Sequence, residues 1–244
     1  MRSSLNITPI QTGLFHLNDN LNAFLKENLK PNPIKDGDVL AITSKIVSLA
    51  EGQVVNKNSI DKISLIKREA DYDLGDLGYG SRLTIKHGMM IPSAGIDESN
   101  SENAQYILFP KNPFLSARNI YQHIAEEFNL NKFGIIITDS RTMPLRLGVT
   151  GIALSYYGFE GVRNLVGKKD LFAQPLKMTQ VNIVDSLAVA AVLMMGEADE
   201  SSPLAVIRNA QVQFTGSVNK EELLVTPVND MYYPLYKSHL INNN

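Results

Sequence analysis

The sequence of 244 residues contains no cysteine. A disulfide, a thiolate metal site and a cysteine nucleophile are therefore excluded. Histidine is scarce as well. The four histidines show no spacing typical of metal ligands: His16, His87, His123 and His239. We interpret them as surface or packing residues, and we look for functional side chains among the acids, the hydroxyls and the bases.

The chain also lacks a strong excess of charge and a long apolar run. Its 23 basic and 25 acidic residues leave a net charge of −2, which indicates no nucleic-acid or anionic-membrane surface. The longest apolar run, 187–195, is too short to span a bilayer, and residues 1–9 have no signal-peptide core. We expect a cytoplasmic protein with no nucleic-acid or membrane partner.

The apolar content of 44% predicts an ordinary globular core. Short apolar, β-branched runs predict buried strands at 39–42, 134–138 and 204–207, and helical spacing of apolar residues predicts helices at 60–68, 115–128 and 181–195. Strands and helices do not alternate regularly, so we predict an α+β fold with mixed sheets. Residues 1–244 are expected to form one domain, with two lobes around a cleft.

Familiar catalytic motifs are missing. The sequence has no P-loop, no Gly-x-Gly-x-x-Gly, no Gly-x-Ser-x-Gly and no His-Glu-x-x-His. What remains are apolar runs that end abruptly in acids and hydroxyls. Strand ends position side chains with little freedom, as a metal or phosphate site requires.

The first such cluster follows a proline-terminated run at 89–92. Asp97, Glu98, Ser99 and Asn100 place two carboxylates, a hydroxyl and an amide together. Hard cations such as Mg²⁺ prefer oxygen ligands of this kind. The same residues are also typical of a polar turn or a helix N-cap, and the sequence leaves both interpretations open.

The second cluster is Asp139-Ser140-Arg141, directly after the predicted strand 134–138. An acid at the end of a buried strand is a candidate metal ligand, and Ser140 adds a hydroxyl oxygen. Arg146 follows in the same predicted loop, and we predict that it acts in catalysis by holding a phosphate through paired hydrogen bonds. The alternative is a capping Asp-Ser pair with a solvated arginine.

Two further clusters complete the set. Glu197 begins an acidic stretch at the end of the predicted helix 181–195, where a carboxylate is unfavourable without a compensating cation. The alternative is a solvated acidic loop. Ser44 and Lys45 follow the strand 39–42, and a lysine there binds phosphate as a point charge. Spacing alone indicates a metal–phosphate site.

Five stretches of sequence follow one another in an order that is characteristic of a known family: 37–52, 93–100, 108–113, 138–140 and 185–197. The Gly-Ile-Asp-Glu-Ser-Asn string at 95–100 is the most specific of them. Together they resemble the coenzyme F420-0:γ-glutamyl ligase family over roughly residues 9 to 210. The resemblance implies an α+β homodimer that uses GTP or ATP, two divalent cations (Mg²⁺ or Mn²⁺) and, in many members, K⁺.

The resemblance also implies a reaction and a set of site residues. An acceptor carboxylate becomes an acyl phosphate, which the amine of L-glutamate attacks. Asp97 and Asp139 would hold one metal, with Ser140 and Glu197 at the second. The nucleotide contacts would be Gly13, Leu14, Ser44, Lys45 and Asn100. A water-excluding cleft is expected, because an acyl phosphate hydrolyses in open water.

The chain departs from the family at two basic positions. Leu49 stands where F420 ligases usually have lysine, and 141–144 replaces a Phe-Gly-Arg-Pro-type segment. With fewer cations, the site should bind the phosphodiester of F420-0 less well. We therefore expect that the preferred acceptor is not F420-0, and that a folate or another carboxylated cofactor competes with it for this role. Two other classes stay open: a metal-dependent hydrolase or phosphatase, and a non-catalytic nucleotide-binding protein.

Overall fold

A mixed five-stranded sheet is the largest element of the computed structural model, which describes residues 4–99, 101 and 104–241. Its strands lie in the order β1 (Asn6–Ile10), β12 (Leu204–Arg208), β2 (Val39–Thr43), β8 (Gly134–Thr142) and β9 (Val149–Tyr157). β2 and β8 are parallel, and the other neighbours are antiparallel. The predicted strands at 39–42, 134–138 and 204–207 and the α+β class are confirmed.

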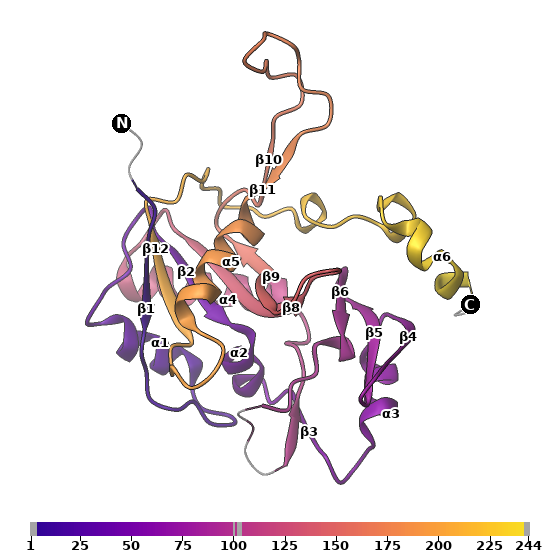
Figure 1. Ribbon diagram of the computed structural model, residues 1–244. Coiled ribbons are helices and arrows are strands. Elements are labelled where there is room, and N and C mark those ends of the chain that lie inside the picture. The colour runs from indigo at the N-terminus through magenta and orange to yellow at the C-terminus, as the bar shows by residue number, and fades with distance from the viewer. Residues whose placement is uncertain (1–3, 100, 102–103, 242–244) are drawn as a thin grey trace.

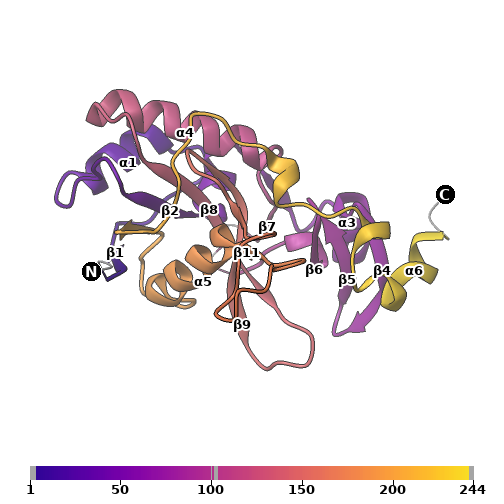
Figure 2. The same cartoon turned by 90° about the horizontal axis from the view of Figure 1, so that it is seen from above.

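Helices cover both faces of this sheet (Figure 2). α1 (Leu21–Leu29) and α4 (Pro113–Phe128) pack on one face, and α5 (Ile183–Met195) packs on the other. Alternation along β2 explains the two layers, because Leu40 faces the first core and Ala41 faces the second. The predicted helices at 115–128 and 181–195 are confirmed, except that the second begins later because 180–182 form a strand.

A second group of elements lies beside the main sheet (Figure 1). It contains a three-stranded antiparallel sheet, a two-stranded sheet and connecting helices: β4 (Tyr72–Gly78), β5 (Ser81–Lys86), β6 (Met89–Pro92), β3 (Val54–Asn56), β7 (Gln105–Ile107), α3 (Lys62–Glu69) and η1 (Ser93–Gly95). The predicted helix at 60–68 is confirmed as α3. α2 (Ser44–Ala50) connects the main sheet to this group.

The C-terminal segment crosses from the main sheet to the three-stranded sheet (Figure 1). It contains η2 (Lys220–Glu222), η3 (Pro227–Asn229) and α6 (Tyr233–Ile241). Tyr236 of α6 is buried in a small core with Leu74 and Ile85, so this segment packs against the three-stranded sheet. Tyr232, by contrast, is 60% exposed.

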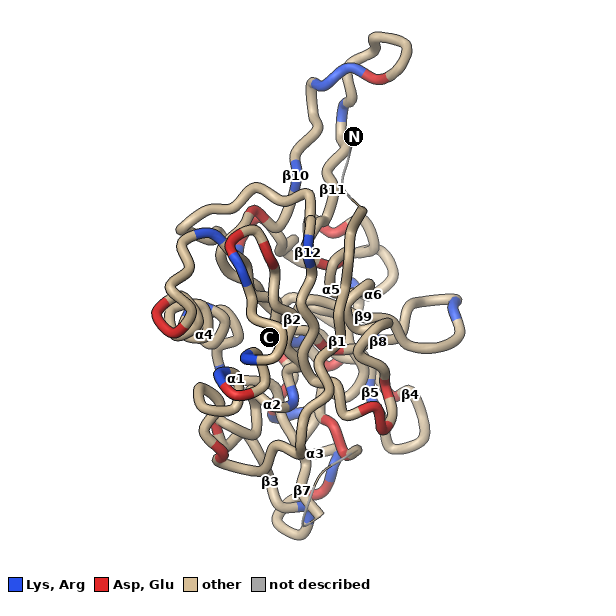
Figure 3. Tube along the Cα trace, turned by 90° about the vertical axis from the view of Figure 1, so that its left-hand side faces the viewer, with Lys and Arg blue, Asp and Glu red and all other residues tan. Residues whose placement is uncertain are grey.

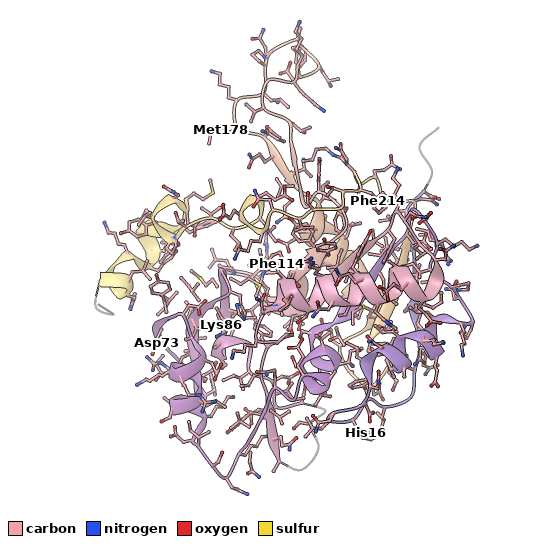
Figure 4. The ribbon with its side chains drawn as sticks, turned by 180° about the vertical axis from the view of Figure 1, so that it is seen from behind. His16, Asp73, Lys86, Phe114, Met178 and Phe214 are labelled. Atoms are coloured by element: carbon pink, nitrogen blue, oxygen red, sulfur yellow. The ribbon has the colours of Figure 1, made fainter. Side chains whose placement is uncertain are left out.

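A long hairpin built on β10 (Val162–Asn164) and β11 (Gln180–Asn182) projects from the molecule (Figure 1). Sequence patterns did not predict it. Met178, labelled on it in Figure 4, is 83% exposed, and Leu171 is 99% exposed. Acidic and basic residues are distributed over both groups of elements (Figure 3). Within the described part of the chain, no helix combines the length and apolar character needed to cross a membrane.

Candidate functional site

A cleft of about 610 Å³ lies where the main sheet meets the segment that follows β6. Its walls come from residues 12–15 after β1, the start of α2, residues 91–99, residues 138–142 of β8 and the loop after α5. The lining includes most of the predicted site residues: Gly13, Leu14, Lys45, Asp97, Asp139, Ser140 and Glu197. A volume of this order is ordinary for a small-molecule site.

Asp139 and Ser140 lie inside a strand and not beyond its end. β8 continues to Thr142, and Asp139 is paired with Ile152 of β9. The prediction that the strand ends at Thr138 is therefore wrong, because polar residues at its far end still pair with β9. The register shifts between Ile137 and Thr138, and such a bulge changes the direction in which the following side chains point.

Asp139 is held by two donors from the protein. The buried hydroxyl of Ser44, the first residue of α2, donates a hydrogen bond to its carboxylate, and the backbone N–H of Ser140 donates another at 2.7 Å. Burial nevertheless raises the pKa of Asp139 to about 6, helped by the negative charge of Asp97. The carboxylate thus lies in a place that favours an added positive charge.

Lys45, in the first turn of α2, reaches across the cleft to Asp97. Its Nζ lies 2.6 Å from Asp97 Oδ2 and also donates to the carbonyl of Ser99 at 3.1 Å. The N–H and hydroxyl of Ser99 donate to the other oxygen of Asp97, at 2.7 and 2.8 Å. Burial acts to raise the pKa of Asp97, but Lys45 and Ser99 outweigh it and hold that pKa below its usual range.

Glu197 enters the cleft directly after the C-terminal cap of α5. Gly196 adopts a φ of 87°, a backbone conformation that favours glycine. Burial raises the pKa of Glu197, and the charge of Glu200 adds to the effect, although a side-chain hydrogen bond with Ser140 opposes it. Glu197 is therefore a second carboxylate in the cleft whose negative charge is not fully balanced by a neighbouring cation.

The donor set fits a hard divalent cation in its chemistry. Within residues 4–99, 101 and 104–241, no three acidic or histidine side chains are arranged as a ready metal site. Lys45 and Ser44 engage Asp97 and Asp139 instead. The cleft nevertheless collects carboxylate and hydroxyl oxygens, and burial raises the pKa values of Asp139 and Glu197, so a bound cation would stabilise their charged forms.

Some predicted residues are placed elsewhere. Arg146 lies exposed at the tip of the β8–β9 hairpin and does not line the cleft. Asn100 falls outside the described residues. Ser44 is buried behind Asp139, so its predicted nucleotide contact stays a prediction. Glu98 pairs with Lys57 and Lys62 at 3.2 and 2.5 Å, a structural role that fits the interpretation of this stretch as a turn.

Arg141 belongs to the predicted Asp139-Ser140-Arg141 cluster, although the phosphate-holding role was predicted for Arg146 in the following loop. Arg141 lines the cleft, and its Nε is buried with no hydrogen-bond partner among the described residues. The Nε has almost no surface to offer a ligand, but the guanidinium group of an arginine that lines the cleft can bind an anion through its other N–H groups. The sequence signal for Arg141 was weak, because Arg141 and Arg146 occur in one polar segment. Only the pairing of β8 with β9 shows that Arg141 lies at the cleft and Arg146 at the hairpin tip.

Comparison with known proteins gives a consistent result. The family model described as F420-0:Gamma-glutamyl ligase matches residues 9–209. A coenzyme F420:L-glutamate ligase of Methanococcus maripaludis is 37% identical over 214 residues, which cover 81% of this chain and 86% of that protein. The protein of the same name from Methanocaldococcus jannaschii is 36% identical over 78% of this chain and 82% of its own, and that from Methanopyrus kandleri is 31% identical over 82% and 86%.

Proposed function

Because the chain belongs to the F420-0:γ-glutamyl ligase family, we propose that it is an amide-forming ligase that joins L-glutamate to an F420-type carboxylate acceptor, using a nucleoside triphosphate. One observation supports this most directly. Lys45, Asp97, Asp139 and Glu197 come from four separate parts of the chain and line one cleft. Such a mixture of carboxylates and a cation suits phosphoryl transfer, in which catalysis is mainly positioning and electrostatic stabilisation.

The proposed reaction has two steps. The acceptor carboxylate attacks the γ-phosphorus, and the nucleoside diphosphate leaves. The amine of L-glutamate then attacks the acyl carbon, an amide bond forms, and inorganic phosphate leaves. The acyl phosphate must be shielded from water between the steps. We take the main sheet and the β4–β6 group as two lobes of one unit that provide this shielding.

We propose roles for individual residues from the family resemblance, supported by their places in or beside the cleft. Two divalent cations (Mg²⁺ or Mn²⁺), with Asp97 and Asp139 at one and Ser140 and Glu197 at the other, would neutralise the charge of the transferred phosphoryl group. Lys45 supplies a point charge for a phosphate at the start of α2. Arg141 lines the cleft and would offer its guanidinium group to a phosphate or a carboxylate.

The acceptor is the least constrained part of the proposal. The three relatives named above are all coenzyme F420:L-glutamate ligases, which supports an F420-type acceptor. In the sequence, Leu49 and the segment 141–144 argue against F420-0 as the acceptor, because they lack basic residues that F420 ligases usually have there. Arg141 lines the cleft and could supply such a charge. A reduced folate stays as the competing acceptor.

The test is a coupled assay on the purified chain. Nucleotide turnover is measured with Mg²⁺ and F420-0, with and without L-glutamate, and mass spectrometry identifies any product that gains a glutamyl residue. GTP and ATP are compared in parallel, with and without K⁺. Turnover that depends on glutamate supports the ligase. Phosphoester hydrolysis without glutamate would favour a hydrolase, and nucleotide binding without turnover a non-catalytic protein.

We also propose a homodimer. Large apolar side chains are exposed on two neighbouring elements: Leu145 (101%) and Leu147 (105%) at the tip of the β8–β9 hairpin, and Leu193 (80%) on α5. Large apolar side chains that are this exposed are candidates for burial in a protein interface. Light scattering at micromolar concentration should give twice the mass of the chain, and Leu193→Glu should shift it towards the monomer. A protein that is active but monomeric at micromolar concentration would contradict the proposal.

A further inference from the structure

Three consecutive residues with left-handed backbone conformation lead into Asp97. Ser93 and Ala94 each have a φ of 54°, and Gly95 has a φ of 72°. The N–H of Ile96 donates to the carbonyl of Ser93 at 2.9 Å and closes the turn. Left-handed conformation is unfavourable for residues with a Cβ, and it persists only where the surroundings hold it. Specific contacts must therefore stabilise this turn.

The hydroxyl of Thr84 provides such a contact. Thr84 is completely buried, at 0% exposure, in the middle of β5. Its Oγ1 donates to the carbonyl of Ile91 at 2.6 Å and accepts from the N–H of Ala94 at 2.9 Å. The hydroxyl thus joins the last strand of the small sheet to the centre of the left-handed turn. Without it, a buried N–H group would have no partner.

The far side of the turn is fixed as well. A Cβ on Gly95 would lie 2.1 Å from Phe109 Cζ, so the turn packs directly against that buried ring. Two backbone hydrogen bonds of 2.9 Å then join Asp97 to Ile107. Asp97 is held between the turn on one side and β7 on the other, and in this position it lines the cleft.

We propose that Thr84 is a positioning residue for the acidic cleft: its buried hydroxyl holds the left-handed turn 93–95 and so fixes the place of the Asp97 carboxylate. The proposal rests on the proposed function, because it takes Asp97 as a metal-binding group. It also assigns a role to the small β4–β6 sheet, which contributes no carboxylate to the cleft and instead supports the segment that does.

The experiment compares three variants of the full chain. Thr84→Val keeps the volume and removes the hydroxyl, and Thr84→Ser restores the hydroxyl. Ser155→Ala is the matched control, because Ser155 is equally buried and donates to the Pro113 carbonyl at 2.7 Å but does not line the cleft. Hydrogen exchange of 89–97 is followed without metal, and Mn²⁺ affinity is measured by electron paramagnetic resonance. Thermal midpoints report the general loss of stability.

Thr84→Val should exchange faster at 93–97 and should bind Mn²⁺ about tenfold more weakly, as is typical when support for a metal ligand is lost. Thr84→Ser should be close to the original protein, and Ser155→Ala should lower the thermal midpoint without changing Mn²⁺ affinity. Unchanged Mn²⁺ affinity in Thr84→Val, or an equal loss in Ser155→Ala, would overturn the proposal.

If the original protein binds no Mn²⁺, the metal part of the proposed function fails. Exchange then decides: faster exchange at 93–97 in Thr84→Val supports the role of Thr84, and unchanged exchange overturns it.

Discussion

The Nζ of Lys45 lies 2.6 Å from the carboxylate of Asp97. Lys45 belongs to the first turn of α2, next to the main sheet, and Asp97 follows the small β4–β6 sheet. This ion pair therefore joins the two groups of elements across the cleft. It also places one cation among three carboxylates: burial raises the pKa values of Asp139 and Glu197, and the charge of Lys45 opposes that rise, while it helps to hold the pKa of Asp97 below its usual range.

Replacement of Lys45 tests the nucleotide site. Lys45→Met should raise the nucleotide dissociation constant about tenfold or more, because a charge-assisted contact with phosphate contributes roughly 1.5–3 kcal/mol. Titration calorimetry with Mg²⁺ present measures the constant. Lys111→Met is the control, because Lys111 is exposed and does not line the cleft. Equal effects of the two changes would argue against a special role for Lys45.

Asp139→Asn tests the metal ligands. We expect turnover to fall by about a hundredfold or more, because loss of an anionic ligand should exceed the effect of losing an outer contact. The fold should survive, since the backbone of Asp139 stays paired with Ile152. Steady-state turnover and circular dichroism check the two parts. Asp73→Asn, outside the cleft, should keep normal turnover, and an active Asp139→Asn would remove this residue from the metal set.

Arg141 and the acceptor are tested together. Arg141→Met should lower kcat/KM for F420-0 more than for a reduced folate monoglutamate, because only F420-0 has a phosphodiester for the guanidinium to bind. A charge-assisted contact makes about a tenfold difference or more in this ratio. Arg146→Met, at the exposed hairpin tip, is the matched control. A larger effect of Arg146→Met would return the phosphate-binding role to that residue, as the sequence first suggested.

Asp73 should make stability depend on acid pH. Burial acts to raise the pKa of Asp73, but hydrogen bonds from Arg82 Nε at 2.7 and 2.9 Å and its charge leave that pKa below 3.8. A folded-state pKa below the unfolded one stabilises the protein above about pH 4, and the contribution is lost as pH falls through the folded value. Figure 4 shows Asp73 on the small sheet.

The measurement is urea unfolding of the original protein and of Asp73→Asn. At pH 7 the variant should be less stable by about 1 kcal/mol, as for a hydrogen-bonded ion pair that is partly buried. The difference in stability between the two proteins should become smaller as the pH falls below about 4. Arg82→Met and the double variant complete the cycle and isolate the coupling of the two residues. A difference that does not change with pH would show that the ion pair is not its source.

Sequence patterns were informative where a local signal was strong. Continuous apolar runs predicted β2, β8 and β12, and helical spacing predicted α3, α4 and α5. The patterns missed β9, because Gly151 and Ser155 interrupt its apolar run, and they missed β10 and β11, because strands of three residues are too short to show a pattern. The end of β8 was also missed, since Asp139 to Thr142 owe their extended conformation to pairing with β9 and not to their own preferences.

The sequence by itself determined which chemical groups this protein has: oxygen donors after apolar runs, a lysine beside hydroxyls, and no thiols. Only the tertiary structure decided how they are used. It brought Asp97, Asp139 and Glu197 to one cleft, turned Ser44 towards Asp139 and left Arg146 exposed. It also revealed Thr84, a residue within an ordinary strand pattern. The physical reason is that a hydrogen bond depends on the position of both partners, and residues distant in sequence acquire those positions only when the two groups of elements pack together.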